Sequence, residues 1–194
     1  MNQNLDKEYW DTRYIENQTA WDASEITTPL KEYFDQLTNK DMKILIPGAG
    51  NAYEAEYLFN QGFSDITVVD ISKKPLDNLQ ARVTGFPSEN LICEDFFSHE
   101  GNYQLIIEQT FFCALNPSLR ESYVQKMASL LMPGGKLVGV LFNCEFEGGP
   151  PFGGNKDEYL VLFQPFFNIK TFETCYNSIK PRSERELFVI LERL

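Results

Sequence analysis

Two glycines and an acid stand at the ends of short apolar runs, where a ligand could be held. Gly48 and Gly50 follow the run 43–46, and glycines there let the backbone turn sharply and approach a ligand closely. Asp70 ends the next run, where a carboxylate can accept hydrogen bonds from both hydroxyls of a ribose. A plain tight turn or a helix cap would explain each feature alone. Together they favour a nucleoside ligand.

The residues after the glycines argue against a dinucleotide. The fingerprint G-x-G-x-x-G has a third glycine where helix and strand pack closely, but Tyr53 stands there. Glu54 and Glu56 follow, and carboxylates in a first helical turn stabilise the helix but compete with a bound pyrophosphate. This pattern disfavours NAD and FAD. It is compatible with a cofactor that has no phosphates, such as S-adenosylmethionine.

Two further apolar runs end in polar residues. Asp95 could accept the exocyclic amine of an adenine, with Phe96 against the ring, although a phenylalanine at a strand end is also a common core residue. Glu108 and Gln109 end the other run. The chain has one histidine, His99, and four widely spaced cysteines, so no zinc cluster and no other metal site is predicted.

The elements that carry these residues alternate between strand and helix. Apolar runs predict strands over 43–46, 66–69, 91–93, 104–107, 136–142, 169–175 and 187–191. Helical spacing predicts helices over 29–38, 52–61, 72–83, 117–131 and 157–163. Strands joined by helices form a parallel sheet covered on both faces, and ligands bind at the carboxyl ends of such strands. We predict an α/β, Rossmann-like, doubly wound fold with a mostly parallel seven-stranded sheet and an antiparallel last strand.

The segment before this core has a different character. Residues 10–22 show no clean helix or strand period, yet they contain Trp10, Tyr14 and Trp21. Aromatic rings in a polar, irregular segment usually pack over another part of the protein or over a ligand. The length of 194 residues suits one domain. We therefore predict a single domain, 1–194, in which the arm and helix of residues 1–40 form a lid over the core, 41–194.

Composition narrows the choice of partners. Lys and Arg number 17 against 28 Asp and Glu, a net charge of −11, and this excess repels nucleic-acid phosphates and anionic membrane surfaces. The first residues are polar and acidic, and no apolar run approaches the roughly 20 residues that span a bilayer. We expect a monomeric cytoplasmic protein that acts on a small molecule, without nucleic acid or membrane as a partner.

The order of motifs along the chain resembles the thiopurine S-methyltransferase superfamily, most closely its thiol and halide methyltransferase branch. After Trp10 and Trp21 come PGAGNAYEA, VVDIS, FFCALNP, LLMPGGKL and EGGPPF. The runs FFCALNP (111–117) and GGPPF (148–152) carry the resemblance best, because generic Rossmann-like methyltransferases lack them. The resemblance implies S-adenosyl-L-methionine as the cofactor. It assigns Trp10, Tyr14, Trp21, Gly48, Asp70, Asp95 and Phe96 to the cofactor. To these cofactor-binding residues we add Gly50 of the glycine turn and Gln109 at the end of its strand.

The same resemblance implies that the tryptophans of the arm close over the cofactor, with Tyr14 replacing a third family tryptophan. Gln109 stands where the thiol and halide branch often has tyrosine, and this departure leaves the acceptor open. Phe111 and Phe152 could line an apolar acceptor pocket, with ordinary core packing as the alternative for each.

The predicted reaction is direct, in-line transfer of a methyl group to a small thiol, halide or related chalcogen nucleophile. Thiols have a pKa near 8.5, so part of the acceptor is thiolate without a dedicated base, and no catalytic acid or base is assigned. One alternative is an O-methyltransferase for small carboxyl or hydroxyl acceptors, with Glu108 as the base. Another is a protein that binds the cofactor without turnover.

Overall fold

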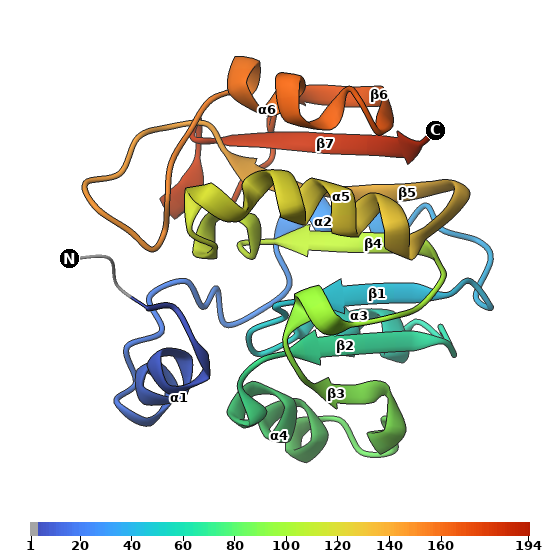
Figure 1. The fold of residues 1–194 in the computed structure, drawn as a ribbon. Helices are drawn as coiled ribbons and strands as arrows, with labels where there is room; N and C mark the ends of the chain where they lie inside the picture. The colour runs from blue at the N-terminus through green and yellow to red at the C-terminus, as the bar shows by residue number, and fades with distance from the viewer. Residues whose placement is uncertain (1–3) are drawn as a thin grey trace.

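The sheet of the protein has seven strands in the order β3-β2-β1-β4-β5-β7-β6 (Figure 1). The structure is a computed structural model that describes residues 4–194. The strands are β1 (Ile44–Pro47), β2 (Ile66–Asp70), β3 (Leu91–Cys93), β4 (Tyr103–Gln109), β5 (Leu131–Phe142), β6 (Phe167–Thr174) and β7 (Glu186–Arg193). Neighbours from β3 to β5 pair in parallel, and β7 lies antiparallel between β5 and β6. The predicted doubly wound sheet with an antiparallel last strand is confirmed.

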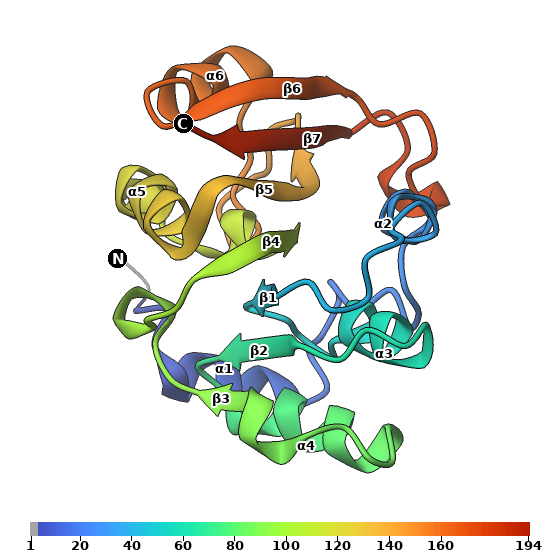
Figure 2. The same cartoon turned by 90° about the vertical axis from the view of Figure 1, so that its right-hand side faces the viewer.

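Helices cover both faces of the sheet (Figure 2). The α-helices are α1 (Lys7–Ile15), α2 (Thr28–Phe34), α3 (Tyr53–Asn60), α4 (Lys73–Arg82), α5 (Arg120–Leu130) and α6 (Lys156–Phe163). The short 3-10 helices are η1 (Ser88–Asn90), η2 (Phe96–Ser98), η3 (Phe112–Ala114), η4 (Pro117–Leu119) and η5 (Lys180–Arg182). Helices α5 and α6 pack on one face, whereas α2, α3 and α4 pack on the other. None of the helices between residues 4 and 194 has the length and apolar character needed to cross a membrane.

The core has two layers because successive side chains of a strand point to opposite faces. In β1, Leu45 packs with the side chains of α5 and α6, whereas Ile44 and Ile46 pack with those of α2, α3 and α4. All three are at most 2 % exposed. A strand that is buried on both faces needs a continuous apolar run, which is the pattern that identified it in the sequence.

The arm differs from its prediction, because residues 7–15 form helix α1 rather than an irregular segment. The Asp6 side chain caps the helix and accepts a hydrogen bond from the Tyr9 backbone N–H at 3.1 Å. None of the residues of α1, all of which the structure describes, is fully buried. A helix without a buried face has no reason to show an apolar stripe, so the periodic signal was missing. Of the predicted lid 1–40, residues 1–3 lie outside the described residues.

The strands β4 and β5 differ most from their predicted bounds. β4 continues through Gln109, and β5 begins at Leu131, before the Pro133–Gly135 turn that was predicted to separate helix from strand. Leu131 pairs with Tyr103, and the register shifts between Tyr103 and Leu105. Proline and glycine are tolerated there because the irregularity interrupts the regular ladder.

Candidate active site

A cavity of about 670 Å³ is lined by residues at the carboxyl ends of β1, β2 and β4, by residues that follow β3 and by residues of α1. Ten of the eleven predicted site residues line it: Trp10, Tyr14, Trp21, Gly48, Gly50, Asp70, Asp95, Phe96, Gln109 and Phe111. Phe152 lies outside this lining, with its ring against Gly149, while Pro150 and Pro151 of the same loop line the cavity. The volume is within the range of sites that bind small molecules and cofactors.

The glycine turn after β1 forms the floor of the cavity. Gly48 and Gly50 have φ angles of +55° and +53°, in the left-handed region that favours glycine. A Cβ atom on Gly48 would lie 2.1 Å from the Phe111 ring, and one on Gly50 would lie 3.6 Å from the Tyr14 hydroxyl oxygen. Side chains from the arm and from the segment after β4 therefore close directly over the turn.

Asp70 ends β2 as a buried carboxyl group that is 8 % exposed. Its Oδ1 accepts a hydrogen bond from the Ser72 backbone N–H at 2.9 Å. Burial raises the pKa of Asp70 to about 6, although the backbone N–H groups of Ser72 and Gly50 favour the ionised form. A carboxylate held this way at the rim of the sheet can accept hydrogen bonds from ligand hydroxyls.

Asp95 and Phe96 follow β3 at the neighbouring position. Asp95 is exposed and caps η2, with its Oδ1 accepting from the Phe97 backbone N–H at 3.0 Å. Phe96 is 4 % exposed and packs edge-on against Phe111, with ring centroids 5.1 Å apart. Phe96 therefore belongs both to the core and to the cavity wall.

Edge-to-face aromatic contacts and polar contacts hold the arm over the cavity. Trp21 lies between Trp10 and Tyr14, with ring centroids 5.6 and 5.8 Å away. Asp11 of α1 accepts a hydrogen bond from the Ser72 hydroxyl, just before α4, at 2.6 Å. The cluster of rings is thus fixed in place by the same segment that positions Asp70.

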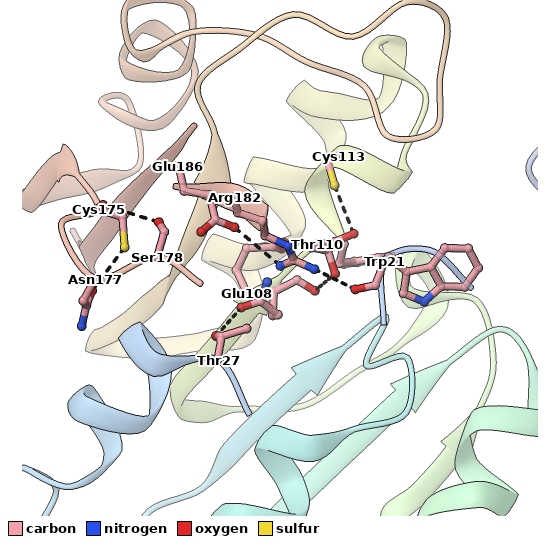
Figure 3. Close-up of polar contacts among 12 residues, drawn as sticks. Trp21, Thr27, Glu108, Thr110, Cys113, Cys175, Asn177, Ser178, Arg182 and Glu186 are labelled. Carbon is pink, nitrogen blue, oxygen red and sulfur yellow. Dashed lines mark hydrogen bonds and ion pairs between the residues drawn. The ribbon is translucent and has the colours of Figure 1, made fainter. Parts of the chain in front are cut away.

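Gln109 and Arg182 line the cavity, and each has a buried side-chain N–H group that makes no hydrogen bond within the described chain. Gln109 accepts a hydrogen bond from the Thr27 hydroxyl at 2.9 Å, but its Nε2 has no partner among residues 4–194. Arg182 of η5 donates from Nη2 to the Trp21 carbonyl oxygen at 2.7 Å and pairs with Glu186 at 3.5 Å (Figure 3). Its Nη1 is the atom of that ion pair and makes no hydrogen bond within the described chain. Buried donors of this kind are usually satisfied, and a ligand can do so.

Glu108 lies outside the residues that line the cavity. It is 1 % exposed, and its Oε1 accepts from the backbone N–H groups of Phe111 and Phe112 at 2.8 and 3.0 Å. The Tyr123 hydroxyl donates to Oε2. Burial raises the pKa of Glu108 to about 7. These three donors hold the Glu108 carboxyl group in place and shape the chain after β4.

His99 is buried as well, at 3 % exposure. Its Nδ1 lies 2.6 Å from Glu94 Oε1, and its Nε2 lies 2.8 Å from the Tyr103 hydroxyl. Within residues 4–194, no group of three or more His, Cys, Asp or Glu side chains is arranged to hold a metal ion.

The cavity wall also contains residues that the sequence reasoning did not assign to the site, among them Glu54, Cys113 and Arg182. Glu54 was considered only for its charge in the first turn of a helix, but it is 5 % exposed. Arg182 belongs to a short 3-10 helix with no motif around it, so nothing in the sequence indicated its place.

The model of the family "Thiopurine S-methyltransferase (TPMT)" matches residues 5–193. The chain belongs to this family. Among its relatives, "Probable thiol methyltransferase 2" of Arabidopsis thaliana is 29% identical over 162 residues, which cover 80% of this chain and 71% of that protein. "Thiocyanate methyltransferase 1" of Brassica oleracea is 25% identical, with 91% and 81% covered. "Thiopurine S-methyltransferase" of Photobacterium profundum is 24% identical, with 82% and 83% covered.

Solved structures show the same fold at low sequence identity. The magnesium protoporphyrin IX methyltransferase of Synechocystis with bound S-adenosylmethionine has a TM-score of 0.74 at 14% identity, and both chains are covered completely. The 1,6-didemethyltoxoflavin-N1-methyltransferase of Burkholderia thailandensis, with S-adenosylhomocysteine, has a TM-score of 0.71 at 16% identity, covering 96% of this chain and 86% of that one. The predicted family and fold are confirmed.

This thiopurine S-methyltransferase family member is an S-adenosyl-L-methionine-dependent methyltransferase. The cavity fits the cofactor, because it joins a glycine turn, a buried carboxylate and an aromatic wall without requiring a phosphate site. Asp70 would hold the ribose hydroxyls, Asp95 and Phe96 the adenine, and the glycine turn the methionine chain.

Proposed function

We propose that this methyltransferase transfers its methyl group to a small thiol, taken as the thiolate, and that it also accepts halides and related anions. The observation that carries the proposal is Gln109, which lines the cavity and whose buried amide Nε2 has no acceptor among residues 4–194. Buried donors without acceptors favour an anion over a neutral molecule of the same size.

The rest of the chamber supports the same choice. Bound S-adenosylmethionine supplies a methyl group that is already activated on a sulfonium. The chain then has to hold a nucleophile in line and exclude water. Phe111, Phe142 and Phe146 supply apolar wall, and the burial of Cys113 raises its thiol pKa, which keeps this thiol neutral beside the acceptor.

An O-methyltransferase would need a base for the proton of a hydroxyl acceptor. Glu108, the acid considered for that role, is engaged by donors from Phe111, Phe112 and Tyr123 outside the cavity lining. A thiol avoids the requirement because it ionises in solution near neutral pH. The names of the relatives, which refer to thiols, thiocyanate and thiopurines, agree with a sulfur nucleophile.

We also propose that the N-terminal lid, expected over residues 1–40, covers the cofactor through α1 and the residues up to α2, because α2 itself packs in the core. Its support is the aromatic cluster of Trp10, Tyr14 and Trp21 above Gly50, with the anchors Asp11 to Ser72 and Trp21 to Arg182.

The experiment is a product screen with methyl-labelled cofactor across thiols, sulfide, iodide, thiopurines, small carboxylic acids and phenols. We expect methylated thiols and methyl iodide. The ratio of kcat/KM for a thiol to kcat/KM for iodide should rise with pH as the thiol ionises, because iodide has no proton to lose. The proposal would be overturned if only the carboxylic acids or phenols gave products. It would also be overturned if the kcat/KM ratio of thiol to iodide did not change with pH around the thiol pKa.

A matched pair of variants tests the anion site. Gln109→Leu removes the free amide donor, whereas Thr27→Val removes only the hydroxyl that bonds to it. We expect Gln109→Leu to raise KM for iodide on the order of tenfold, the effect of one hydrogen bond to an anion, and Thr27→Val to change it much less. Equal effects of the two substitutions on KM would mean that Gln109 contributes to packing and does not bind the anion.

A further inference from the structure

One buried acid of the cavity has no role in the account so far. Glu54 is the second residue of α3, 5 % exposed, and it lines the cavity just after the glycine turn. Charged groups are rarely buried to this extent without a partner. Its companion on the same helix, Glu56, is more exposed and pairs with Arg82.

The cations near Glu54 are engaged elsewhere. Arg182 and Arg82 are the positive groups whose charges lower the pKa of Glu54, but Arg182 pairs with Glu186 and Arg82 with Glu56. Asp22 adds a second negative charge near Glu54. The hydrogen bond that favours the carboxylate comes from the backbone N–H of Glu54 itself. This corner of the cavity therefore has an excess of negative charge and no cation of its own.

Helix stabilisation does not account for this arrangement. A carboxylate in the first turn of a helix gains from the helix dipole equally well when exposed, as Glu56 is placed to do. Burial instead raises the pKa of Glu54 to about 7, so ionisation at neutral pH costs free energy in the free protein. A ligand that brings a positive charge would remove that cost.

The order of the strand ends indicates which part of the cofactor arrives here. Asp95 and Phe96 follow β3, Asp70 ends β2, and Glu54 follows β1. S-adenosylmethionine is elongated, with adenine at one end, ribose next and the amino acid at the other end. With the adenosine held at β3 and β2, the amino acid must lie over β1 and the start of α3.

We propose that Glu54 binds the α-ammonium group of the cofactor's methionine portion as its charged partner. This assignment needs the cofactor of the proposed function but is independent of the acceptor. It adds a binding residue that fixes the amino-acid end while Asp70 fixes the ribose. A carboxylate paired with an ammonium group is the arrangement that satisfies both buried charges.

The test measures binding by calorimetry, without turnover. Two ligands are compared: S-adenosylhomocysteine and its analogue that lacks the α-amino group. The wild-type protein should bind the first more tightly on the order of 10- to 100-fold, the effect of one charged hydrogen-bonded pair. This comparison needs no variant, so it does not depend on whether a mutant folds.

The variant Glu54→Gln should reduce that preference to within about threefold, chiefly by weakening S-adenosylhomocysteine. Glu121→Gln, an exposed acid in the first turn of α5 and outside the cavity lining, is the matched control and should keep the wild-type preference. An undiminished preference in Glu54→Gln, or an equal loss for both ligands, would overturn the assignment. A failed thiol screen with the preference intact would sink only the acceptor proposal, so the two failures are distinguishable.

Discussion

Replacing Glu108 with glutamine removes a charge but keeps the shape of a side chain that is 1 % exposed. The glutamine Oε1 can still accept from the Phe111 and Phe112 N–H groups, and the Tyr123 hydroxyl can turn to accept from Nε2. Glu108→Ala leaves three buried donors without an acceptor, which costs about 1–3 kcal/mol for each. We expect Glu108→Ala to lose most of the stability of the protein and Glu108→Gln to fold.

The pH dependence of the free energy of unfolding gives a quantitative test of Glu108→Gln. The pKa of Glu108 is raised from 4.5 to about 7 in the folded state. A raised carboxyl pKa contributes stability that is fully present below the unfolded pKa and lost as pH rises through the folded pKa. At 1.36 kcal/mol per pKa unit, the wild-type protein loses about 2–3 kcal/mol from this group between about pH 5 and pH 8. Glu108→Gln lacks that loss, so it should gain stability relative to wild type as pH rises.

Urea unfolding of both proteins across this pH range measures the difference directly. Activity with a thiol acceptor is measured alongside, and we expect kcat of Glu108→Gln within about threefold of wild type because the carboxyl group lies outside the cavity lining. A stability difference independent of pH, together with a loss of kcat on the order of 100-fold or more, would identify Glu108 as a base. That result would refute the structural role and revive the O-methyltransferase alternative.

Two further predictions concern the cofactor. Trp10→Ala should weaken S-adenosylhomocysteine binding about 5- to 100-fold in calorimetry, the usual range for an aromatic contact with a base. The control Ile15→Ala, on the same helix and 75 % exposed, should leave the affinity unchanged. Unchanged affinity in Trp10→Ala would contradict the proposal that this segment is a lid. Asp70→Asn should weaken S-adenosylhomocysteine and 5′-methylthioadenosine by the same factor, on the order of tenfold or more, because both keep the ribose; a loss confined to one ligand would contradict a ribose contact.

The sequence was sufficient for the sheet and for the residues at its rim. β1 and β2 are continuous apolar runs because both faces of the central strands are buried. Parallel strands bring their carboxyl ends to one edge, so Gly48, Gly50 and Asp70 had to lie together once the fold was known. Their roles in binding remain predictions, although the cavity brings them together.

Other parts of the site depend on contacts that a sequence pattern does not contain. Arg182 reaches Trp21 across 161 residues, because β7 returns between β5 and β6 and brings η5 to the cavity. Helix α1 lacks an apolar stripe because its aromatic residues face a ligand cavity rather than a core. Phe152 and its neighbour Pro151 differ in whether they line the cavity, although they are adjacent in the motif. The spacing of residues along the chain does not show which side chains of distant segments line the same cavity.

The buried acids show what structure adds to composition. A net charge of −11 counts every carboxylate alike, but Glu108, Asp70 and Glu54 differ in the donors that the protein supplies. Glu108 accepts from three donors and does not line the cavity. Asp70 accepts from backbone N–H groups and lines the cavity. Glu54 also lines the cavity, but it has only its own backbone N–H and an excess of negative charge nearby. Burial of a carboxylate costs free energy unless the group is hydrogen-bonded or paired. The fewer donors the protein provides to a buried acid, the more a bound ligand must provide. This order predicts no ligand group for Glu108, hydroxyl groups for Asp70 and a full positive charge for Glu54.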